Sequence, residues 1–519
     1  IALPGEHRDG HNYIKKAWDA GVRCFLVSRK VDFESFGDSV FILTENTLLG
    51  LQAIAAYHRS LFKIPVIGIT GSNGKTIVKE WLYQMLSGEI NIAKSPKSYN
   101  SQLGVPMSVI TLRPENELAI FEAGISQKGE MDRLEAIIQP TIGILTYMGA
   151  AHSEGFESKT AKIEEKLKLF KHADFVIYQK KDNTHEAIQR VLPETRKFSW
   201  GVNVDADVIF IIEKVKTRKT IASVKYLGNI YKIKIPFTDD IYLHNAFTCI
   251  TYLIHAGYSI ELIESMIGKL QPLPMRMELK TGIFNSVLIN DTYSSDINSI
   301  ALAFAAARKE AGKGRMAFIV SDFAYSDNHT HDDYEVLVSL VNEFRPALFI
   351  GVGEKVRNIR IKMDPEIRAS FFHNTESLLQ GMDITQFRDT TVLLKGARRF
   401  GFEQIVDRLE QRAHEAALEI NLSALEHNLN RYRAKITYPV KLMVMIKASA
   451  YGSGSVEVAR VLQQQGIDYL AVAYIDEGIY LRKAGISLPI MVMNSGMDFV
   501  ERMVEYDLEP EIYAPAQLH

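Results

Sequence analysis

The residues best suited to chemistry form a glycine-rich loop between an apolar run and a helical pattern. The run at residues 64–70 contains Gly68 and leads into further glycines at 71 and 74. Glycine lets the backbone approach phosphate oxygens, and a helix N-terminus adds free N–H groups and a positive dipole. A lysine there reaches the outer phosphates, and a threonine hydroxyl can ligate Mg²⁺. The loop therefore predicts ATP binding by Gly71, Ser72, Asn73, Gly74, Lys75 and Thr76.

This loop is a variant of the phosphate-loop pattern, because Ile69 stands where the strict pattern has glycine. The alternative is a glycine-rich turn beside a solvated lysine. A strand before the loop and a helix after it favour ATP. The loop by itself leaves open whether the protein is a motor, a kinase or a ligase.

Further segments along the chain resemble one family. The loop resembles the ATP loop of the Mur ligases and their folate-polyglutamate relatives. Residues 99–106 resemble the N-x-x-x-G-V-P segment of the Mur ligase that adds D-alanyl-D-alanine, residues 121–124 its E-x-G motif, and residues 149–156 its A-A-H-x-E-G-F motif. The resemblance implies that Glu122 and His152 bind Mg²⁺ or Mn²⁺ and that Asn100 contacts substrate. Outside such a motif, a lone histidine is more often structural.

The resemblance implies a ligase in which a carboxylate becomes an acyl phosphate and is then attacked by an amine. Divalent cations neutralise the phosphates and the developing charge in such chemistry. Lys166 matches a lysine that Mur ligases carry as a carbamate beside the second metal. Two alternatives stay open: Lys168 takes that place, or the segment is the exposed face of a charged helix.

Later motifs imply the remaining ligase contacts. Asn245 matches the asparagine that reads adenine, although Thr248 stands where the family has a second asparagine. Arg276, in a linker-like segment, is implied as a phosphate ligand. The segment beginning at Asn290 resembles D-D-S-Y-N-A-N with Ser294 and Ser295 in place of Asn-Ala. The remaining implied residues are Asp291 at the ATP ribose, and Lys395 and Arg398 at a carboxylate or phosphate of the incoming substrate.

The last hundred residues resemble a different family, the alanine racemases. Residues 418–429 are similar to the racemase opening, and residues 445–454 to its cofactor motif. The resemblance implies that Lys447 forms a Schiff base with pyridoxal phosphate and acts as a base, with Tyr451 near the cofactor phosphate. The alternative for Lys447 is a solvent-facing lysine at a strand end. A barrel of this kind needs about 250 residues, so the racemase part is expected to be incomplete and inactive.

The N-terminal region fits the ligase family in part. Residues 2–11 resemble the A-L-x-G-x-x-x-D-G-H segment expected near a uridine nucleotide, without the strand and turn that usually precede it. The chain opens with Ile1 rather than methionine. The sequence is therefore expected to be truncated at both ends.

Composition limits the function further. The 519 residues carry a net charge of −2, with 47% hydrophobic and 24% charged residues. This balance predicts an ordinary globular protein without a general affinity for nucleic acid. Only Cys24 and Cys249 occur, and no apolar run of about 18 residues predicts a membrane span. A cytoplasmic location is expected.

The elements that must position these residues alternate along the chain. β-Branched runs and helical patterns predict an α/β fold with largely parallel sheets. We expect three Mur ligase domains and the first part of a (β/α)8 barrel, at residues 1–62, 63–270, 271–413 and 416–519. The strands expected are 24–28, 40–43, 64–70, 118–122, 141–146, 175–178, 208–212, 222–235 (a meander), 286–290, 316–321, 347–351, 391–395, 418–421, 441–446 and 469–473.

The resemblance to the Mur ligases implies a ligase that uses ATP to join D-alanyl-D-alanine to UDP-N-acetylmuramoyl-tripeptide. The nearest alternative is a sister amide ligase that adds glutamate or a diamino acid. An isomerase with a scaffold ligase domain and a non-enzymatic, nucleotide-gated interaction module are more distant possibilities. Retention of Lys75, Thr76, Glu122 and His152 argues against both. The oligomeric state is open, although a complete racemase would favour a dimer.

Overall fold

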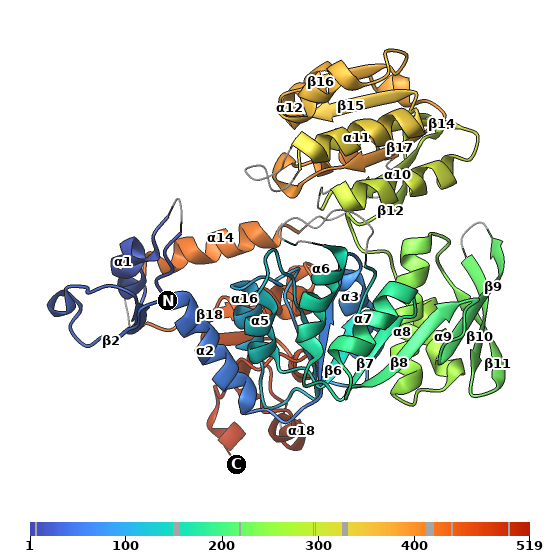
Figure 1. Ribbon diagram of the computed structural model, residues 1–519. Coiled ribbons are helices and arrows are strands. Elements are labelled where there is room, and N and C mark those ends of the chain that lie inside the picture. Colours follow the sequence, from blue (N-terminus) through green and yellow to red (C-terminus); the bar gives the residue numbers. More distant parts are fainter. Residues whose placement is uncertain are drawn as a thin grey trace. The chain divides into compact units, whose positions relative to one another are not determined.

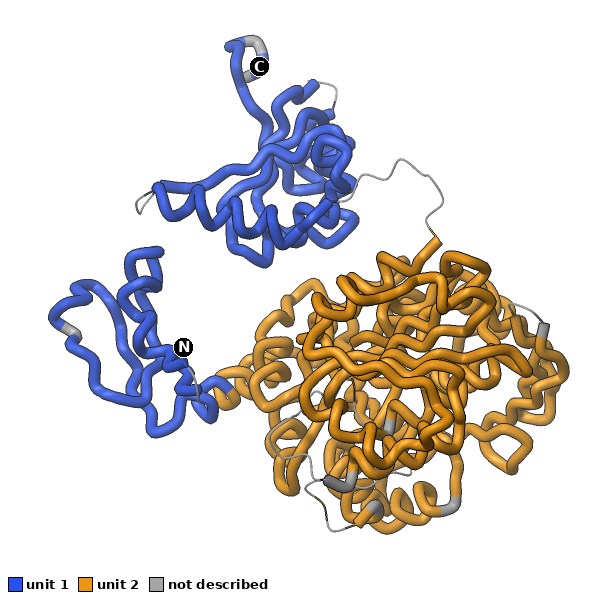
Figure 2. Tube along the Cα trace, turned by 90° about the horizontal axis from the view of Figure 1, so that it is seen from above, with its two compact units in different colours: residues 1–51, 414–519 blue, residues 52–413 orange. Residues whose placement is uncertain are grey.

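Helices and strands alternate along the chain in the computed structural model (Figure 1). The structure describes residues 1–519 except 6, 7, 149–155, 157, 217, 218, 294, 296, 324–330, 412–419, 437–439, 497, 498 and 519. Two compact units are present, one of residues 52–413 and one of residues 1–51 and 414–519 (Figure 2). Within the described residues, no helix combines the length and apolarity needed to cross a membrane.

The larger unit contains a nine-stranded sheet in the order β11-β10-β9-β8-β7-β6-β3-β5-β4. Strands β3 to β9 run parallel, and β9, β10 and β11 form an antiparallel meander. The bounds are β3 Val66–Thr70, β4 Ile92–Lys94, β5 Leu118–Glu122, β6 Ile142–Leu145, β7 Phe175–Gln179, β8 Arg196–Val202, β9 Val208–Lys216, β10 Lys219–Tyr226 and β11 Asn229–Ile235.

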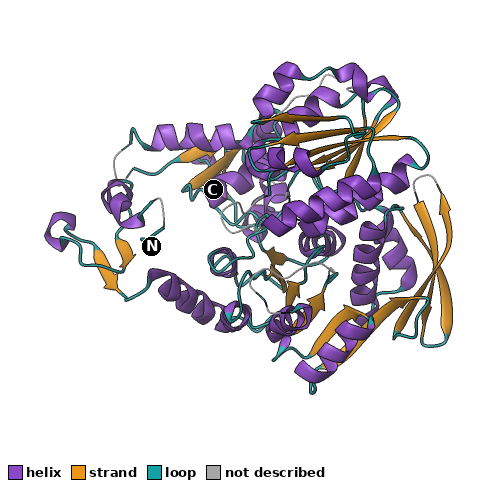
Figure 3. Cartoon of the chain, turned by 45° about the horizontal axis from the view of Figure 1, so that its top comes forward, coloured by secondary structure: helices purple, strands orange, loops and turns teal. Residues whose placement is uncertain are grey.

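Helices lie on both faces of this sheet (Figure 3), and alternate side chains of its strands pack against them. In β3, Ile67 and Ile69 join one core and Val66 joins the other, as the two-residue period of a strand requires. The first face is covered by α3 (Lys75–Leu86), α8 (Asp240–His255) and α9 (Ile260–Gly268). The second is covered by α2 (Thr47–Ser60), α4 (Gly104–Val109), α5 (Glu130–Ile138), α6 (Lys159–Leu167), α7 (Asp182–Val191) and the 3-10 turn η3 (Lys168–Phe170).

A six-stranded sheet forms the rest of the larger unit, in the order β12-β13-β17-β14-β15-β16. Only the pairing of β12 with β13 is antiparallel. The strands are β12 Glu278–Thr281, β13 Val287–Asp291, β14 Arg315–Ser321, β15 Leu348–Val352, β16 Ala369–Phe372 and β17 Thr390–Lys395. Helices α10 (Ile297–Ala311) and α11 (His331–Phe344) pack on one face, and α12 (Thr375–Gly381) and α13 (Glu403–Leu409) on the other. Short 3-10 turns are η4 Ile283–Asn285, η5 Val356–Lys362, η6 Ile384–Phe387 and η7 Arg398–Phe400.

The N-terminal segment of the smaller unit is a βαβ-like piece. Its strands β1 (Cys24–Val27) and β2 (Val40–Leu43) pair in parallel. Phe25 stacks on Phe41 at 4.9 Å, and Phe36 completes a small aromatic core. The associated helices are α1 Ile14–Asp19 and the 3-10 turns η1 Gly10–Tyr13 and η2 Phe33–Phe36.

The C-terminal segment of the smaller unit has four parallel strands in sequence order, β18-β19-β20-β21. Consecutive parallel strands joined by helices are the arrangement with which a (β/α)8 barrel begins. The elements are α14 Leu422–Arg433, β18 Met443–Met445, α15 Lys447–Tyr451, α16 Ser455–Gln464, β19 Tyr469–Val472, α17 Ile475–Lys483, β20 Ile490–Val492, α18 Val500–Glu505, β21 Glu509–Pro510 and η9 Pro515–Leu518.

The α/β class predicted from the sequence is confirmed, as is the meander after residue 208. One expected strand, at residues 418–421, is wrong where it can be judged. Residues 418 and 419 lie outside the described residues, and residues 420 and 421 are not in a strand. The side chain of Asn421 instead accepts a hydrogen bond from the N–H of Ala424 and caps α14.

Candidate active site

The glycine loop connects β3 to α3 with the backbone that phosphate binding requires. All of β3 is buried, and the loop leaves it with a φ of +148° at Gly71. Gly74, with a φ of +91°, is the N-cap of α3. A Cβ atom at Gly71 would lie 2.1 Å from the Oγ1 of Thr146, and one at Gly74 would lie 2.2 Å from the Oδ1 of Asn245. Only glycine fits at these two positions.

Two lysines meet at this loop. The Nζ of Lys75 donates to the carbonyl of Gly71 at 2.8 Å, and the Nζ of Lys166 donates to the same carbonyl at 3.2 Å. Lys166 is only 3% exposed. Burial, together with the nearby charges of Lys75 and Lys162, lowers the pKa of Lys166 well below its ordinary value. A buried amine near a second cation is therefore favoured in its neutral form.

Lys168 lies in different surroundings. Its Nζ forms ion pairs with Asp132 at 2.9 Å and Glu165 at 2.8 Å, and these hydrogen bonds raise its pKa. Of the two lysines that the sequence left open, Lys166 is the one that contacts the phosphate loop.

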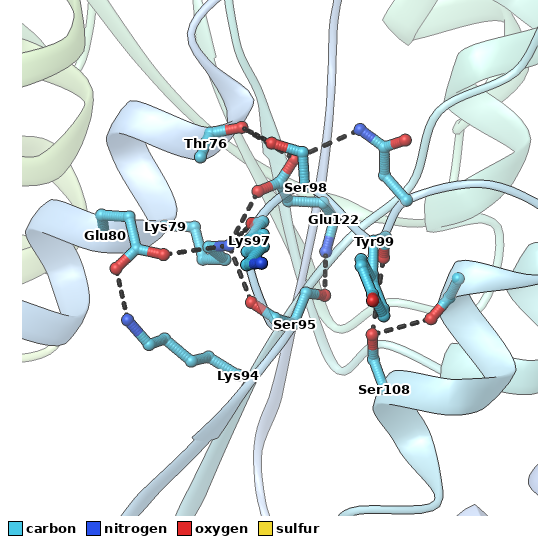
Figure 4. A network of polar contacts seen from close by, with 12 residues as sticks. Thr76, Lys79, Glu80, Lys94, Ser95, Lys97, Ser98, Tyr99, Ser108 and Glu122 are labelled. Carbon is cyan, nitrogen blue, oxygen red and sulfur yellow. Dashed lines mark hydrogen bonds and ion pairs between the residues drawn. The ribbon is translucent and has the colours of Figure 1, made fainter. Parts of the chain in front are cut away.

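Side-chain oxygens from three elements converge beside Thr76, the second residue of α3 (Figure 4). The Oγ1 of Thr76 donates to the Oε2 of Glu122 at 3.1 Å and lies 3.1 Å from the Oγ of Ser98. Asn100 donates to the same Oε2 at 3.4 Å, and Arg276 donates to both hydroxyls at 3.2–3.3 Å. Hydroxyl and carboxylate oxygens are the ligands that Mg²⁺ prefers, so this donor set fits a hard divalent cation.

His152, the other metal ligand implied by the sequence, lies outside the described residues. Within the part of the chain that the structure describes, no group of three or more histidine, cysteine, aspartate or glutamate side chains is arranged so that it could hold a metal ion. The oxygen cluster therefore contains one carboxylate, that of Glu122, together with two hydroxyls.

A cavity of about 250 Å³ opens beside the loop and suits a nucleotide base. Its lining includes Asn73 and Gly74 from the loop, Trp200 from β8, and His244, Asn245 and Thr248 from α8. The Nδ2 atoms of Asn73 and Asn245 and the Nε1 of Trp200 are buried without a hydrogen-bond partner among the described residues. Buried donors of this kind are normally satisfied, so they point to a ligand rich in acceptors.

His244 is neutral in this cavity. Burial is the main cause that lowers its pKa from 6.5 to about 4, and Lys181 adds to the effect. The hydroxyl of Thr248 donates to the carbonyl of His244 at 2.9 Å. The base cavity thus carries no histidine charge at neutral pH.

The predicted residues of the third region fall at the carboxyl ends of its strands. Asp291 and Lys395 are register partners on β13 and β17, and the Nζ of Lys395 donates to the Oδ2 of Asp291 at 2.7 Å. The ring of Tyr293 has Arg276 at 4.1 Å and Arg398 at 5.6 Å from its centroid. Tyr293 therefore links the arginine that reaches Thr76 with the arginine that follows β17.

In the C-terminal segment, Lys447 begins α15 directly after β18. The four residues 448–451 have φ values of 51, 55, 54 and 57°, in the left-handed region. Each such residue costs about 1–2 kcal/mol outside glycine, and strained backbone of this kind gathers at functional sites. Glu477 supports the turn by accepting the N–H of Ala448 at 2.6 Å. Tyr451 is 64% exposed.

Sequence reasoning missed Ser98, Lys79 and Trp200. Ser98 directly precedes the recognised segment at residues 99–106, and its position there was the available signal. Lys79 follows Lys75 by four residues, which places both on one face of α3. No local pattern marks Trp200, because its place in the base cavity depends on the pairing of β8 beside β7.

A largely parallel sheet with this glycine loop, an oxygen cluster and a cavity of about 250 Å³, followed by a second α/β sheet, is typical of an enzyme that uses ATP. Residues 69–253 match the Mur ligase middle domain family, and residues 420–519 match the alanine racemase N-terminal domain family. A Mur ligase homologue thus continues into an alanine racemase N-terminal domain.

Individual relatives support this conclusion. The chain is 25% identical to the UDP-N-acetylmuramoyl-tripeptide–D-alanyl-D-alanine ligase of Bacillus subtilis, over 78% of this chain and 89% of the relative. It is 27% identical to the corresponding ligase of Rickettsia prowazekii, over 78% and 91%. The solved structure of MurF from Acinetobacter baumannii shares the fold, with a TM-score of 0.68 and 22% identity over 78% of this chain and 89% of that chain.

Proposed function

We propose that the ligase part uses ATP to join D-alanyl-D-alanine to UDP-N-acetylmuramoyl-tripeptide, a step in peptidoglycan synthesis. The names of relatives aligned over most of their length support this substrate pair. The observation that carries the chemistry is the meeting of Thr76, Ser98 and Glu122 beside a glycine loop contacted by two lysines. Such a site handles a nucleotide triphosphate together with a cation.

The ligation begins with transfer of the γ-phosphoryl group of ATP to the terminal carboxylate of the tripeptide. The amine of D-alanyl-D-alanine attacks the acyl phosphate, and phosphate leaves from the tetrahedral intermediate. In this proposal Lys75 holds the outer phosphates, and Arg276 adds positive charge beside Thr76. Mg²⁺ bound by Thr76, Glu122 and the implied His152 would neutralise phosphate charge.

Lys166 is the lysine that we assign to the carbamate. Carbamate formation from an amine and CO₂ requires the neutral amine, and burial favours that form here. Lys168, with its raised pKa and two ion pairs, is poorly suited to the reaction. The carbamate would replace the neutral amine with a negatively charged oxygen ligand.

The remaining contacts follow the same proposal. Asn245 donates to the adenine through its unpartnered amide, and Asp291 binds the ribose. Asn100 contacts the peptide substrate, while Lys395 and Arg398 bind the carboxylate of the incoming dipeptide. In the racemase part, Lys447 and Tyr451 would hold pyridoxal phosphate, which supplies an electron sink for deprotonation at the α-carbon of alanine.

The proposal also assigns regions. Residues 1–62 take the uridine-linked substrate, 63–270 take ATP and 271–413 take D-alanyl-D-alanine, with the racemase part at 416–519. We also propose a cytoplasmic site of action.

Product analysis tests the proposal. The full chain is incubated with ATP, Mg²⁺, D-alanyl-D-alanine and UDP-N-acetylmuramoyl-tripeptide labelled with ¹⁸O in its terminal carboxylate. Mass spectrometry should detect the pentapeptide, and the released phosphate should carry one ¹⁸O, as an acyl phosphate requires. Product with glutamate or a diamino acid in place of D-alanyl-D-alanine, on a shorter substrate, would instead identify a sister ligase.

A further inference from the structure

Lys79 is a lysine buried completely beside the oxygen cluster. It lies on α3 and is 0% exposed. Its Nζ donates to the carbonyls of Ser95, at 2.8 Å, and Lys97. It also forms ion pairs with the Oε1 of Glu122 at 3.0 Å and the Oε1 of Glu80 at 3.1 Å (Figure 4). The ammonium group, which has three donors and no acceptor, therefore lies among four oxygens, two as hydrogen-bond acceptors and two as partners in ion pairs.

These contacts fix Lys79 in place. Two of its partners are backbone carbonyls in the turn after β4, where Lys97 has a φ of +50°. Because the side chain has no exposed surface, water cannot replace those partners. Lys79 therefore stays beside Glu122 whether or not the oxygen cluster holds a ligand.

The two oxygens of Glu122 consequently have different surroundings. Oε1 forms the ion pair with the ammonium of Lys79 and accepts no hydrogen bond from the described residues, whereas Oε2 accepts from Thr76 and Asn100 at the oxygen cluster. The backbone N–H of Glu122 donates to the Oγ of Ser95 at 3.1 Å, which fixes the start of the side chain. Only one carboxylate oxygen is presented to a cation at the cluster.

We propose that Lys79 confines Glu122 to one coordinating oxygen and thereby makes the site favour Mg²⁺ over Ca²⁺. Ca²⁺ accepts six to eight ligands and readily takes both oxygens of a carboxylate, whereas Mg²⁺ demands octahedral geometry with single-oxygen ligands. An ammonium on Oε1 blocks the two-oxygen mode. The inference rests on the proposed function only in taking Glu122 as a metal ligand.

A purely structural role for Lys79 makes a different prediction. Removing one partner of a buried ion pair lowers stability, but it leaves the relative affinity for two cations of equal charge unchanged. The ratio of the Ca²⁺ and Mg²⁺ dissociation constants therefore separates selection of the cation from support of the fold.

The test is a calorimetric titration of the full chain with Mg²⁺ and with Ca²⁺ in the presence of ADP. Lys79→Met keeps the length of the side chain and removes its charge. We expect the preference for Mg²⁺ over Ca²⁺ to fall by about tenfold in this variant. The control, Glu80→Gln, removes a carboxylate from the same lysine without touching Glu122 and should keep the wild-type ratio. An unchanged ratio in Lys79→Met would overturn the proposal.

A structure of the wild-type chain with Mn²⁺ and ADP gives a second test that needs no variant. We expect the metal to bind one oxygen of Glu122 at about 2.2 Å, with the other oxygen still paired to Lys79. Two bound oxygens, withdrawal of Lys79, or a metal bound away from Glu122 would each contradict the proposal. Because neither test uses the peptide substrates, failure of the proposed ligase activity would leave these results interpretable on their own.

Discussion

Lys166 and Lys168 are two residues apart but occupy opposite electrostatic surroundings. The first is buried against the loop carbonyl of Gly71 beside the charge of Lys75, so its neutral form is favoured. The second is ion-paired with Asp132 and Glu165, so its charged form is favoured. This contrast between single residues determines which lysine can react with CO₂ and what each contributes to stability.

Replacement of Lys166 should stabilise the fold in a pH-dependent way. The pKa of Lys166 in the folded protein lies below the ordinary value of 10.5. At pH values between the folded pKa and 10.5, the unfolded chain binds more protons than the folded chain, so the free energy of unfolding rises with pH. The destabilisation caused by burying the charged Lys166 is complete at pH values below the folded pKa and disappears above about pH 10.5. In CO₂-free buffer, Lys166→Met should raise the free energy of unfolding at pH 7, with a smaller gain at pH 10.

Urea unfolding at several pH values measures this effect. Lys168→Met is the matched control and should lower stability, because it removes the ion pairs with Asp132 and with the buried Glu165. A gain for Lys166→Met that is the same at pH 7 and pH 10 would contradict the lowered pKa.

Asn245 should contribute to ATP affinity through its unpartnered amide. Because one hydrogen bond is worth about 0.5–1.5 kcal/mol, Asn245→Ala should raise the KM for ATP by about three- to tenfold and leave the KM for D-alanyl-D-alanine unchanged. Steady-state phosphate release measures both constants. The control is Thr248→Val. Thr248 lines the same cavity, but its hydroxyl already donates to the carbonyl of His244, so the substitution should change the KM for ATP by less than about twofold.

Among the elements, β3, the glycine loop and α3 form the proposed phosphate site. The strand is buried throughout, and the loop turns through two positive-φ glycines into the helix N-terminus. Helix α8 packs against the loop, because its Asn245 occupies the space that a side chain at position 74 would need. The loop has little freedom to accommodate a larger residue.

Substitution at Gly71 should therefore remove activity. Gly71→Ala would place a methyl group 2.1 Å from the Oγ1 of Thr146 at a φ of +148°, and we expect ATP turnover to fall by about 100-fold or more. Gly88→Ala, just beyond the same helix, meets no atom within 4 Å and should retain activity. Equal activity in the two variants would show that the loop conformation is not required.

The sequence was most informative where a function is carried by neighbouring residues. The loop from Gly71 to Thr76 could be recognised because its backbone and side chains are contiguous. Ser98 was overlooked although it directly precedes a recognised segment, and Trp200 could not be recognised, since its position depends on strands brought together by folding. The short strands β4, β12 and β16 were missed for a related reason. They are three or four residues long and lie at or near sheet edges, with little apolar alternation.

At the scale of the whole molecule, the C-terminal end of the larger unit is bound to the rest of that unit. Lys280 pairs with Glu410 at 2.9 Å, and the N–H of Gln411 donates to the carbonyl of Thr281 at 2.9 Å. These contacts attach the end of the unit to β12. The nine-stranded sheet, the six-stranded sheet and the candidate active site all lie within residues 52–413.

Removal of the racemase part should consequently leave ligase chemistry intact. A chain ending at Ala413 should release phosphate from ATP within about twofold of the full chain, because the contacts of the ligase site are made within residues 52–413 and independent parts act additively. A chain ending at Gly401 lacks α13, whose buried Ile405, Val406 and Leu409 belong to the core of the second sheet. It should lose activity. Loss of activity in the chain that ends at Ala413 would show that the ligase part depends on the racemase part.

The most direct measurement is phosphate release from ATP by the full chain, with each peptide substrate present or omitted. We predict release only when UDP-N-acetylmuramoyl-tripeptide and D-alanyl-D-alanine are both present, and none from Lys75→Ala. Release that is indifferent to D-alanyl-D-alanine, or that persists without Lys75, would contradict the account.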